Sequence, residues 1–296
     1  MNSKILVTGA TGSLGSKVVN LLKEKISVEN LAVLVRDENS ELAKQYANDG
    51  IDVKTGDYAN LESLENAFRD VDVLYFVSGG DDAKRTVLHK NVVDAAKKAG
   101  VQHIVYTSAV WKDESASSPL ADLVNSHLET ENTIKASGIG YTLLKHNLYA
   151  EVIEMLIGDK NQLLKNKTIY LPTANGLVSF APKQDLAEAA ANILLNASAY
   201  VNKVLAFNGS EQINFSEIAE RISRIVNEPI RYISPEKSEF EIQMDKFGLP
   251  NPIIEILSTF SLAIADGEFD QQSNDLEMVL GRKTTPLSQY LTAAYQ

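Results

Sequence analysis

Residues 4–22 read KILVTGATGSLGSKVVNLL. An apolar run typical of a buried strand ends at Gly9, and a helical pattern follows two further glycines, Gly12 and Gly15. In this context Gly9 permits a tight turn, Gly12 lets backbone approach a pyrophosphate, and Gly15 lets helix and strand pack closely. A dinucleotide would be bound here through Gly9, Thr11, Gly12, Ser13, Leu14 and Gly15. The spacing is G-x-x-G-x-x-G, and glycines also serve turns for conformational reasons alone.

The pattern beyond this turn alternates between strands and helices. Strand-like runs lie at residues 4–8, 31–36, 52–57, 72–78, 103–110 and 140–146, and helical patterns lie at 17–25, 41–49, 61–69, 84–98 and 120–137. Alternation at this spacing is typical of βαβ units around a parallel sheet. The predicted fold class is α/β, with a Rossmann-type doubly wound parallel sheet.

The second half of the chain has a different rhythm. Short strand-like runs at residues 168–172, 176–182, 203–209 and 229–235 are mixed with helical patterns, and the end of the chain is mostly helical. We therefore expect a dinucleotide-binding domain over 1–147 and a smaller C-terminal α+β lobe over 148–296 that covers the substrate. The chain is expected to re-enter the first domain around 181–208.

Composition narrows the classes of function. The 296 residues carry a net charge of −11, which disfavours nucleic acid and anionic membrane surfaces as partners. The chain has no cysteine, so disulfides and thiolate metal sites are excluded, and no His, Asp or Glu group has metal-ligand spacing. The first residues do not resemble a signal peptide, and no apolar stretch approaches the roughly 18 residues of a membrane span. We expect a cytoplasmic protein without a metal.

The end of the second strand indicates which dinucleotide is preferred. An acidic residue about 20 positions past the glycines would bind the ribose 2′-hydroxyl of NAD, whereas an arginine would bind the 2′-phosphate of NADP. Arg36 occupies this position, and a guanidinium suits phosphate oxygens. Asp37 follows directly and could still accept a ribose hydroxyl. We favour NADP(H) over NAD(H).

Two further strand ends are expected to reach the cofactor. Asp57 and Tyr58 end the third strand and could flank the adenine, although GDYAN at residues 56–60 could also be a simple turn into a helix. FVSGG at residues 76–80 ends the fourth strand, where a doubly wound sheet binds ligands, and its glycines could equally serve a flexible loop. From this turn we expect Val77, Ser78 and Gly79 to contact the cofactor.

Several segments together resemble the NmrA-like branch of the atypical short-chain dehydrogenases, and within it the bacterial type 2 NAD(P)H:quinone oxidoreductases. The segments are TGATGSLG (8–15), LVRD (34–37), GDY (56–58), HKNVVDAAKKAGVQHIVYTS (89–108), HLETENTIKASGIGYTLLK (127–145), FD (269–270) and LEMVLGRKTTPL (276–287). They cover essentially the whole chain. The resemblance implies a Rossmann domain, a preference for NADPH without a flavin, and two-electron reduction of a quinone or similar planar acceptor.

The chain departs from ordinary short-chain dehydrogenases at their catalytic helix. Those enzymes carry Tyr-x-x-x-Lys, and here the positions are held by His127 and Glu131. Reduction of a carbonyl to an alcohol by the usual mechanism is therefore not expected. A quinone accepts hydride to give a stable hydroquinone anion. This hydride transfer needs close alignment of the acceptor with the nicotinamide more than it needs a dedicated acid.

Residues after the sixth strand are candidates for binding the acceptor. In LLKHNLYAE, residues 143–151, these are His146, Asn147 and Tyr149. The resembled enzymes have an asparagine followed by an aromatic pair in this segment, so Asn147 and Tyr149 match only approximately. These side chains and His127 could instead be packed and hydrogen-bonded without a catalytic part.

Two other functions remain open from the sequence. The missing Tyr-x-x-x-Lys pair is compatible with a non-catalytic NADP(H)-binding redox sensor of the NmrA type. An atypical reductase or epimerase acting on another planar or sugar substrate is a third option. The expected partner is a small planar acceptor, and a homodimer is one option for the assembly.

Overall fold

The computed structural model describes residues 3–79, 84–112, 114–115 and 118–296. The chain divides into two compact units, and each unit is made of three separate segments of the sequence. Unit 1 contains residues up to Ala109, Asp122–Lys145 and Lys183–Ala206, and unit 2 contains Val110–Ala121, His146–Pro182 and Phe207–Gln296. Gly80, the last residue of the FVSGG stretch, lies outside the described residues.

Unit 1 is built on a seven-stranded sheet in the order β3-β2-β1-β4-β5-β6-β8. The strands are β1 (Ile5–Val7), β2 (Leu31–Val35), β3 (Asp52–Thr55), β4 (Val73–Phe76), β5 (His103–Ala109), β6 (Gly140–His146) and β8 (Lys203–Phe207). Strand β1 pairs in parallel with both β2 and β4, with Ile5 opposite Leu31 and Val73. This reversal of strand order beside β1 is the switch point of a doubly wound sheet. The predicted fold class is confirmed.

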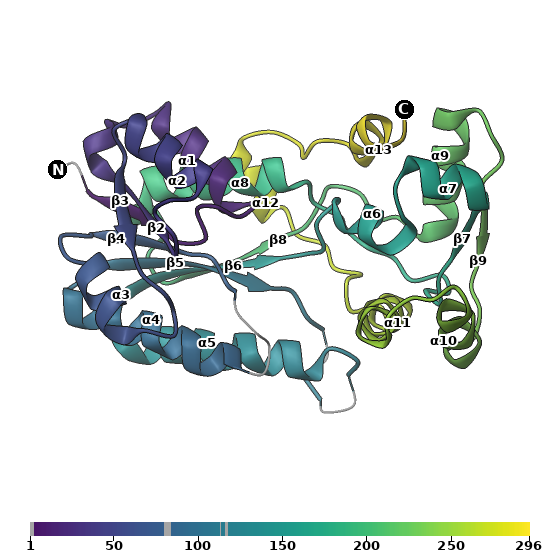
Figure 1. The fold of residues 1–296 in the computed structure, drawn as a ribbon, viewed down its shortest axis with the longest axis horizontal. Helices are drawn as coiled ribbons and strands as arrows, with labels where there is room; N and C mark the ends of the chain where they lie inside the picture. The colour runs from purple at the N-terminus through teal and green to yellow at the C-terminus, as the bar shows by residue number, and fades with distance from the viewer. Residues whose placement is uncertain (1–2, 80–83, 113, 116–117) are drawn as a thin grey trace. The chain divides into compact units, whose positions relative to one another are not determined.

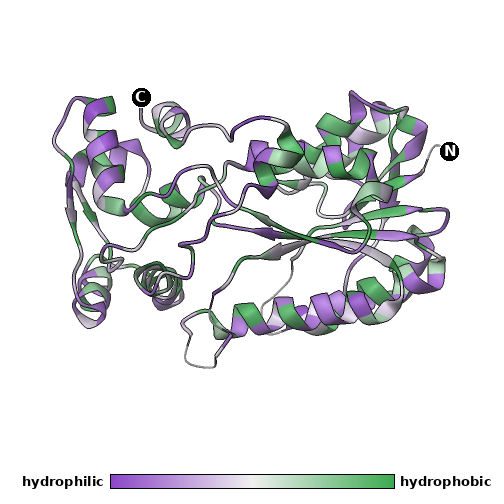
Figure 2. Cartoon of the chain, turned by 180° about the vertical axis from the view of Figure 1, so that it is seen from behind, coloured by the Kyte–Doolittle hydropathy of each residue, from purple (hydrophilic) through white to green (hydrophobic). Residues whose placement is uncertain are grey.

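Helices cover both faces of this sheet (Figure 1). One face carries α1 (Gly15–Lys23), α2 (Glu41–Asn48) and α8 (Lys183–Leu195), and the other carries α3 (Leu61–Ala67), α4 (Arg85–Ala99) and α5 (Ala121–Ser137). Short 3-10 turns lie at η1 (Val28–Asn30) and η3 (Ala197–Tyr200). The helices have a hydrophobic and a hydrophilic side (Figure 2), as expected when one side packs on a sheet.

The sheet is apolar because it is covered on both faces. All five residues of β2, LAVLV, are buried, and so are all four residues of β4. Such continuous apolar runs are typical of parallel strands under helices. Helix α4 ends at Gly100 with φ of 79°, a left-handed C-cap that glycine adopts without strain.

Unit 2 contains a two-stranded parallel sheet and several helices. The strands β7 (Thr168–Tyr170) and β9 (Arg231–Ile233) pair with each other. The helices are α6 (Val152–Ile157), α7 (Lys160–Asn166), α9 (Phe215–Val226), α10 (Lys237–Lys246), α11 (Asn251–Ala265), α12 (Asp275–Leu280) and α13 (Leu287–Tyr295). Helix α9 opens with a capping box formed by Asn214 and Glu217.

The expected strand at residues 176–182 does not form. This segment bonds to three different segments, one or two residues at a time: Val178 pairs with Ile213, Ser179 N–H donates to Phe269 O, and Ala181 N–H donates to Leu148 O. Val178 and Ser179 contact the segment 209–213 only through one isolated bridge and one hydrogen bond from Gly209 N–H, so a regular ladder does not develop. In this segment the apolar pattern indicates that the residues are buried, but it does not indicate that they pair as a strand.

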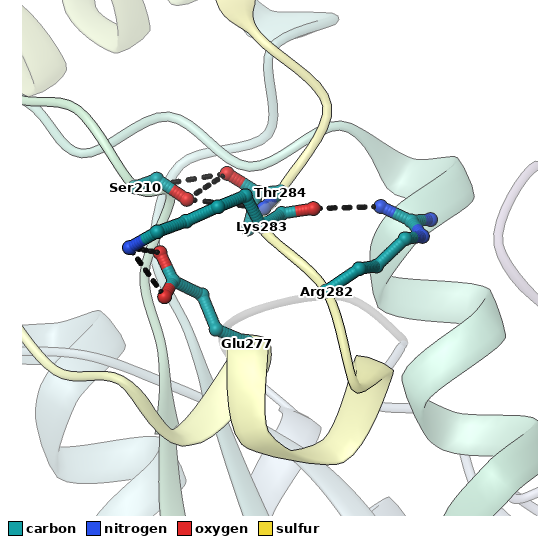
Figure 3. A network of polar contacts seen from close by, with 5 residues as sticks. All are labelled: Ser210, Glu277, Arg282, Lys283 and Thr284. Atoms are coloured by element: carbon teal, nitrogen blue, oxygen red, sulfur yellow. Dashed lines mark hydrogen bonds and ion pairs between the residues drawn. The ribbon is translucent and has the colours of Figure 1, made fainter.

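The C-terminal stretch 276–287 packs within unit 2 (Figure 3). Ser210 and Thr284 exchange two hydrogen bonds, from each backbone N–H to the other's hydroxyl, at 2.9 and 3.0 Å. Lys283 forms an ion pair with Glu277 at 2.8 Å, which holds the pKa of that carboxyl below its usual range. These contacts fix the chain between α12 and α13.

Candidate functional site: a dinucleotide pocket in unit 1

A cavity of about 610 Å³ opens where β1, β2, β3 and β4 end. Its lining consists of Gly9, Thr11, Gly12, Leu34, Val35, Arg36, Gly56, Asp57, Tyr58, Val77, Ser78, Gly79 and Leu88. Nine of these are residues that the sequence assigned to the cofactor. The other three residues of that assignment, Ser13, Leu14 and Gly15, do not line the cavity and lead into α1. The sequence analysis did not predict the apolar lining residues Leu34, Val35 and Leu88, because apolar residues in a pocket wall follow no sequence motif.

The three glycines of the turn are constrained in different ways. Gly9 has φ of +58°, the left-handed region that side chains rarely adopt. A Cβ at Gly15 would lie 2.2 Å from Gly9 O, so a side chain there would disrupt the turn itself. A Cβ at Gly12 would meet only Gly9 O, at 3.2 Å. The protein alone therefore has little need for glycine at position 12, which is what a backbone reserved for a ligand predicts.

The same turn presents hydrogen-bond donors. Gly12 N–H donates to Gly9 O at 2.9 Å, and Ser16 N–H donates to Gly12 O at 3.0 Å. In the described chain the N–H groups of Ser13 and Leu14 have no acceptor. They stand at the N-terminus of α1, where unpaired N–H groups and the helix dipole favour an anion. The residues present thus fit a pyrophosphate.

Tyr46 on α2 supports the glycine turn from behind. Its side chain is 1% exposed, and its hydroxyl donates to Ala10 O at 2.8 Å. Burial, with a smaller effect of the Asp49 charge, raises the pKa of Tyr46 to about 12, so the hydroxyl keeps its proton and remains a donor. The sequence pattern gave no sign of this contact, because it joins residues 36 positions apart.

The turn at residues 77–79 is held by side chains from other strands. Val77 N–H donates to Thr8 Oγ1 at 2.9 Å, and the Tyr58 hydroxyl lies 2.6 Å from Thr8 Oγ1 and 2.9 Å from Val77 O. Ser78 N–H donates to Thr107 Oγ1 at 2.7 Å. These contacts join the carboxyl ends of β1, β4 and β5 and Tyr58, which lies three residues after β3. The turn is therefore preorganised without a ligand.

Arg36 and Asp37 follow β2 and differ in their surroundings. Arg36 lines the cavity and is exposed, and its guanidinium makes no hydrogen bond or ion pair with any described residue. The Asp37 carboxylate accepts from Asn39 N–H at 2.9 Å in a local turn. The guanidinium is thus available to an anionic ligand, whereas the carboxylate is engaged by its own loop.

His127 and Glu131 face the sheet from α5 within unit 1. His127 Nδ1 lies 2.8 Å from the Tyr106 hydroxyl, and the Ser108 hydroxyl donates to Glu131 at 2.7 Å. The two side chains are 4% and 2% exposed. Both are therefore occupied in the core of this unit.

His146, Asn147 and Tyr149 belong to unit 2. His146 Nδ1 lies 3.2 Å from the Tyr149 hydroxyl, and the His146 ring stacks on Phe207. Burial lowers the pKa of His146 to about 3 and raises that of Tyr149, so at neutral pH both groups are uncharged. His146 Nε2 is buried and has no partner among the described residues. The Asn147 amide donates to Asn208 and to Phe269 O, which makes it part of the packing of this segment.

The described part of the chain offers neither a metal site nor a membrane-spanning helix. Among the residues that the structure describes, no group of three or more His, Asp or Glu side chains could hold a metal ion. Every helix in the described ranges is too short or too polar to cross a bilayer.

A doubly wound parallel sheet, with a glycine turn and a basic residue at the ends of its first two strands, defines the class of Rossmann-type dinucleotide-binding proteins. The chain belongs to the NmrA-like family, whose model matches residues 1–294. The resemblance seen in the sequence is thereby confirmed.

Individual relatives span nearly the full length of the chain. Quinone oxidoreductase 2 of Escherichia coli is 29% identical over 285 residues, covering 96% of both chains. Citrobacter sp. triphenylmethane reductase, solved in complex with NADP(H), is 32% identical, with a TM-score of 0.88 over 98% of this chain and 99% of that one. An NADPH-dependent quinone oxidoreductase of E. coli, solved with NADPH, is 27% identical, with a TM-score of 0.89 over 99% and 100%. These homologues are NAD(P)H-dependent oxidoreductases.

Proposed function

We propose that this protein is an NADPH-dependent reductase that transfers two electrons to a quinone or a similar planar acceptor. In this reaction, NADPH, a proton and the quinone give NADP⁺ and the hydroquinone. Reduced nicotinamide supplies the hydride when bound. The protein's own residues bind the dinucleotide and orient the acceptor.

The observation that carries the proposal is the turn at Gly12, where a Cβ would meet only Gly9 O and where the N–H groups of Ser13 and Leu14 have no acceptor among the described residues. The cavity of about 610 Å³ beside that turn supports this assignment. The cofactor-bound relatives, at 32% and 27% identity over nearly the whole chain, support the same assignment.

The preference for NADPH rests on Arg36. Its guanidinium lies at the cavity and has no partner among the residues that the structure describes, while the neighbouring carboxylate of Asp37 bonds to Asn39 N–H. A 2′-phosphate would give Arg36 a charged partner, and a 2′-hydroxyl would not. Asp37, as placed, offers NAD no comparable advantage.

The choice of a quinone rests on what α5 lacks. An ordinary short-chain carbonyl reductase needs a Tyr-x-x-x-Lys pair on this helix. Here the two positions are held by His127 and Glu131, which are buried and bonded to Tyr106 and Ser108. A quinone avoids this need, because its reduced anion is stabilised by aromaticity and takes a proton from water. Quinone reductases among the relatives support this choice, and dye reductases make other planar acceptors a natural extension.

We assign the acceptor side to the segment directly after β6. His146 and Tyr149 form a neutral hydrogen-bonded pair there, and Asn147 lies between them. A buried imidazole nitrogen without a partner is costly unless something else satisfies it. An acceptor oxygen is a chemically suitable partner, so we take His146 and Tyr149 as the first residues to test, with Asn147 in a structural role beside them.

The experiment is a turnover assay with purified protein. NADPH is mixed with a small benzoquinone or naphthoquinone, the nicotinamide absorbance band is followed, and the uncatalysed rate is subtracted. A triphenylmethane dye and an azo dye serve as further acceptors. The Gly12→Val variant, purified in the same way, is the control for contaminating reductases. We expect turnover that is faster with NADPH than with NADH and absent in the variant.

A different result would overturn the proposal. If NADPH binds tightly but no acceptor is reduced above the uncatalysed rate, the protein is a sensor of the NADP(H) pool and not a reductase. If a dye is reduced and quinones are not, the reductase class stands and the quinone assignment fails.

A further inference from the structure

His89 on α4 lies directly behind the turn at residues 77–79. It is fully buried, while its neighbour Leu88 lines the cavity. We propose that His89 is a positioning residue that holds the 77–79 turn in the shape needed for the dinucleotide. This inference rests on the proposed function, because it assigns a role in cofactor binding.

The His89 ring bridges two elements. Nε2 lies 3.0 Å from Gly79 O and 3.3 Å from Gly79 N, and Nδ1 lies 2.9 Å from Thr130 Oγ1 on α5. A neutral imidazole has one donor and one acceptor. The Thr130 hydroxyl donates to Ser126 O at 2.8 Å, so it acts as the acceptor in its contact with His89. With hydrogen on Nδ1, the ring therefore donates to Thr130 and accepts from Gly79 N–H.

The surroundings keep the ring neutral and fix its orientation. Burial lowers the pKa of His89 to about 4, so the ring is uncharged at neutral pH. Three aromatic rings meet it edge-on: Phe76 at 4.8 Å, Tyr106 at 5.8 Å and Tyr58 at 6.2 Å between centroids. A ring enclosed in this way cannot swing aside when the Gly79 peptide moves.

His89 completes the support of the turn. Val77 is held by Thr8, and Ser78 is held by Thr107, both from the sheet. Gly79 has no side chain, and a Cβ there would meet nothing within 4 Å, so packing cannot fix it. The His89 bridge supplies the missing restraint, and it does so from the helices and not from the sheet.

The His89 bridge also gives α5 a role that differs from that of the corresponding catalytic helix in ordinary short-chain dehydrogenases. Its inward polar residues His127, Thr130 and Glu131 bond to Tyr106, His89 and Ser108. Of these three residues, Thr130 is the one that bonds directly to His89, which in turn contacts the turn at residues 77–79. The helix therefore supports the cofactor instead of supplying an acid.

Three variants test the proposal. His89→Leu removes both ring nitrogens, and His89→Gln keeps a donor and an acceptor at the end of a side chain of similar reach. His103→Leu is the matched control: His103 is also buried, has its pKa lowered to about 4, and bonds to Thr142 at 2.8 Å, but it begins β5 at the opposite edge of the sheet from the pocket. Urea unfolding is measured for all three, so that losses of stability can be compared.

Two readouts are taken. The first is the NADPH dissociation constant by calorimetry, which requires no turnover. The second is amide hydrogen exchange at residues 77–79 in the protein without nucleotide. We expect His89→Leu to raise the dissociation constant about tenfold or more and to expose the Gly79 amide to exchange. His89→Gln should recover most of both properties, and His103→Leu should change affinity by less than about twofold despite a similar loss of stability.

The proposal is overturned if His89→Leu keeps wild-type affinity and protection, or if His103→Leu weakens NADPH binding equally. It is also overturned if the wild-type protein binds no NADPH. Tight binding without reduction of any quinone refutes the proposed reaction alone, and the role of His89 is then still decided by affinity and exchange.

Discussion

At the scale of single residues, the most informative position is Gly12. Gly9 is required by its positive φ and Gly15 by contact with Gly9 O, so both are explained by the fold. Gly12 has only one close neighbour for a Cβ, at 3.2 Å, a contact that a shift of a few tenths of an ångström relieves. We therefore attribute the requirement for glycine here to the ligand, and we expect substitution at this position to separate binding from folding.

We therefore expect Gly12→Val to abolish binding of both NADPH and NADH while lowering the free energy of unfolding by no more than about 1 kcal/mol. Gly15→Val should instead lose roughly 3 kcal/mol or more, because its side chain overlaps backbone. Calorimetry and urea unfolding on the two variants measure these effects. A Gly12→Val protein with wild-type affinity would refute the assignment of the turn.

We propose that Arg36 determines the preference between the two nicotinamide cofactors. Arg36→Ala should weaken NADPH binding by roughly 1.5–3 kcal/mol, the range for a lost charged hydrogen bond, and leave NADH binding nearly unchanged. Asp37→Ala is the matched control and should alter neither affinity by more than about twofold, because that carboxylate bonds to its own loop. Equal losses for NADPH and NADH in Arg36→Ala would show that the guanidinium does not bind the additional phosphate.

Sequence spacing predicted the residues that face the pocket better than those that support it. Glycines, Arg36 and the strand-end residues fall at fixed distances from the first strand, because the topology places strand ends together. Thr8, Tyr46, Thr107 and His89 support the pocket through hydrogen bonds between distant segments, which follow no spacing. A weak signal did exist: Thr8 and Thr107 are polar residues at buried positions of apolar strands.

At the scale of elements, α2 is tied to the glycine turn by one hydrogen bond from Tyr46 to Ala10 O. Tyr46→Phe leaves that buried carbonyl without its partner. We expect the free energy of unfolding to fall by about 1–3 kcal/mol and NADPH affinity to fall several-fold, because the turn loses a restraint.

Phe68→Leu provides the comparison for Tyr46→Phe, because Phe68 is fully buried and does not line the cavity. It should lower stability without changing NADPH affinity. If Tyr46→Phe retained full affinity at the same loss of stability, the hydroxyl would have no part in shaping the turn.

The sequence predicted the elements of unit 1 more completely than those of unit 2. In unit 1, strands β1 to β5 pair in continuous parallel registers, so an apolar run and a ladder coincide, as in β2. In unit 2 the run at 176–182 is equally apolar, but its bonds go to three separate segments. Burial is encoded locally, whereas the identity of the partner strand depends on the rest of the fold.

At the scale of the whole molecule, three buried histidines link stability to pH. Burial lowers the pKa values of His89, His103 and His146 from 6.5 to about 4, 4 and 3. Between about pH 6.5 and 4 the unfolded chain binds protons on these rings and the folded chain does not. Acidification through this window therefore favours the unfolded state.

We expect the free energy of unfolding to fall by about 2 kcal/mol or more between about pH 7.5 and pH 5, as measured by urea unfolding. The His103→Gln variant lacks one of the three rings and should show a shallower dependence on pH. A free energy that stays constant or rises on acidification would contradict the neutral, buried state of these rings.

The central claim is that the cavity at the ends of β1 to β4 binds NADPH through the glycine turn and Arg36. Isothermal titration calorimetry of the wild-type protein with NADPH and with NADH tests it most directly. The account predicts binding of one NADPH per chain, at least about tenfold tighter than NADH. No heat with either nucleotide, or equal affinity for both, would contradict it.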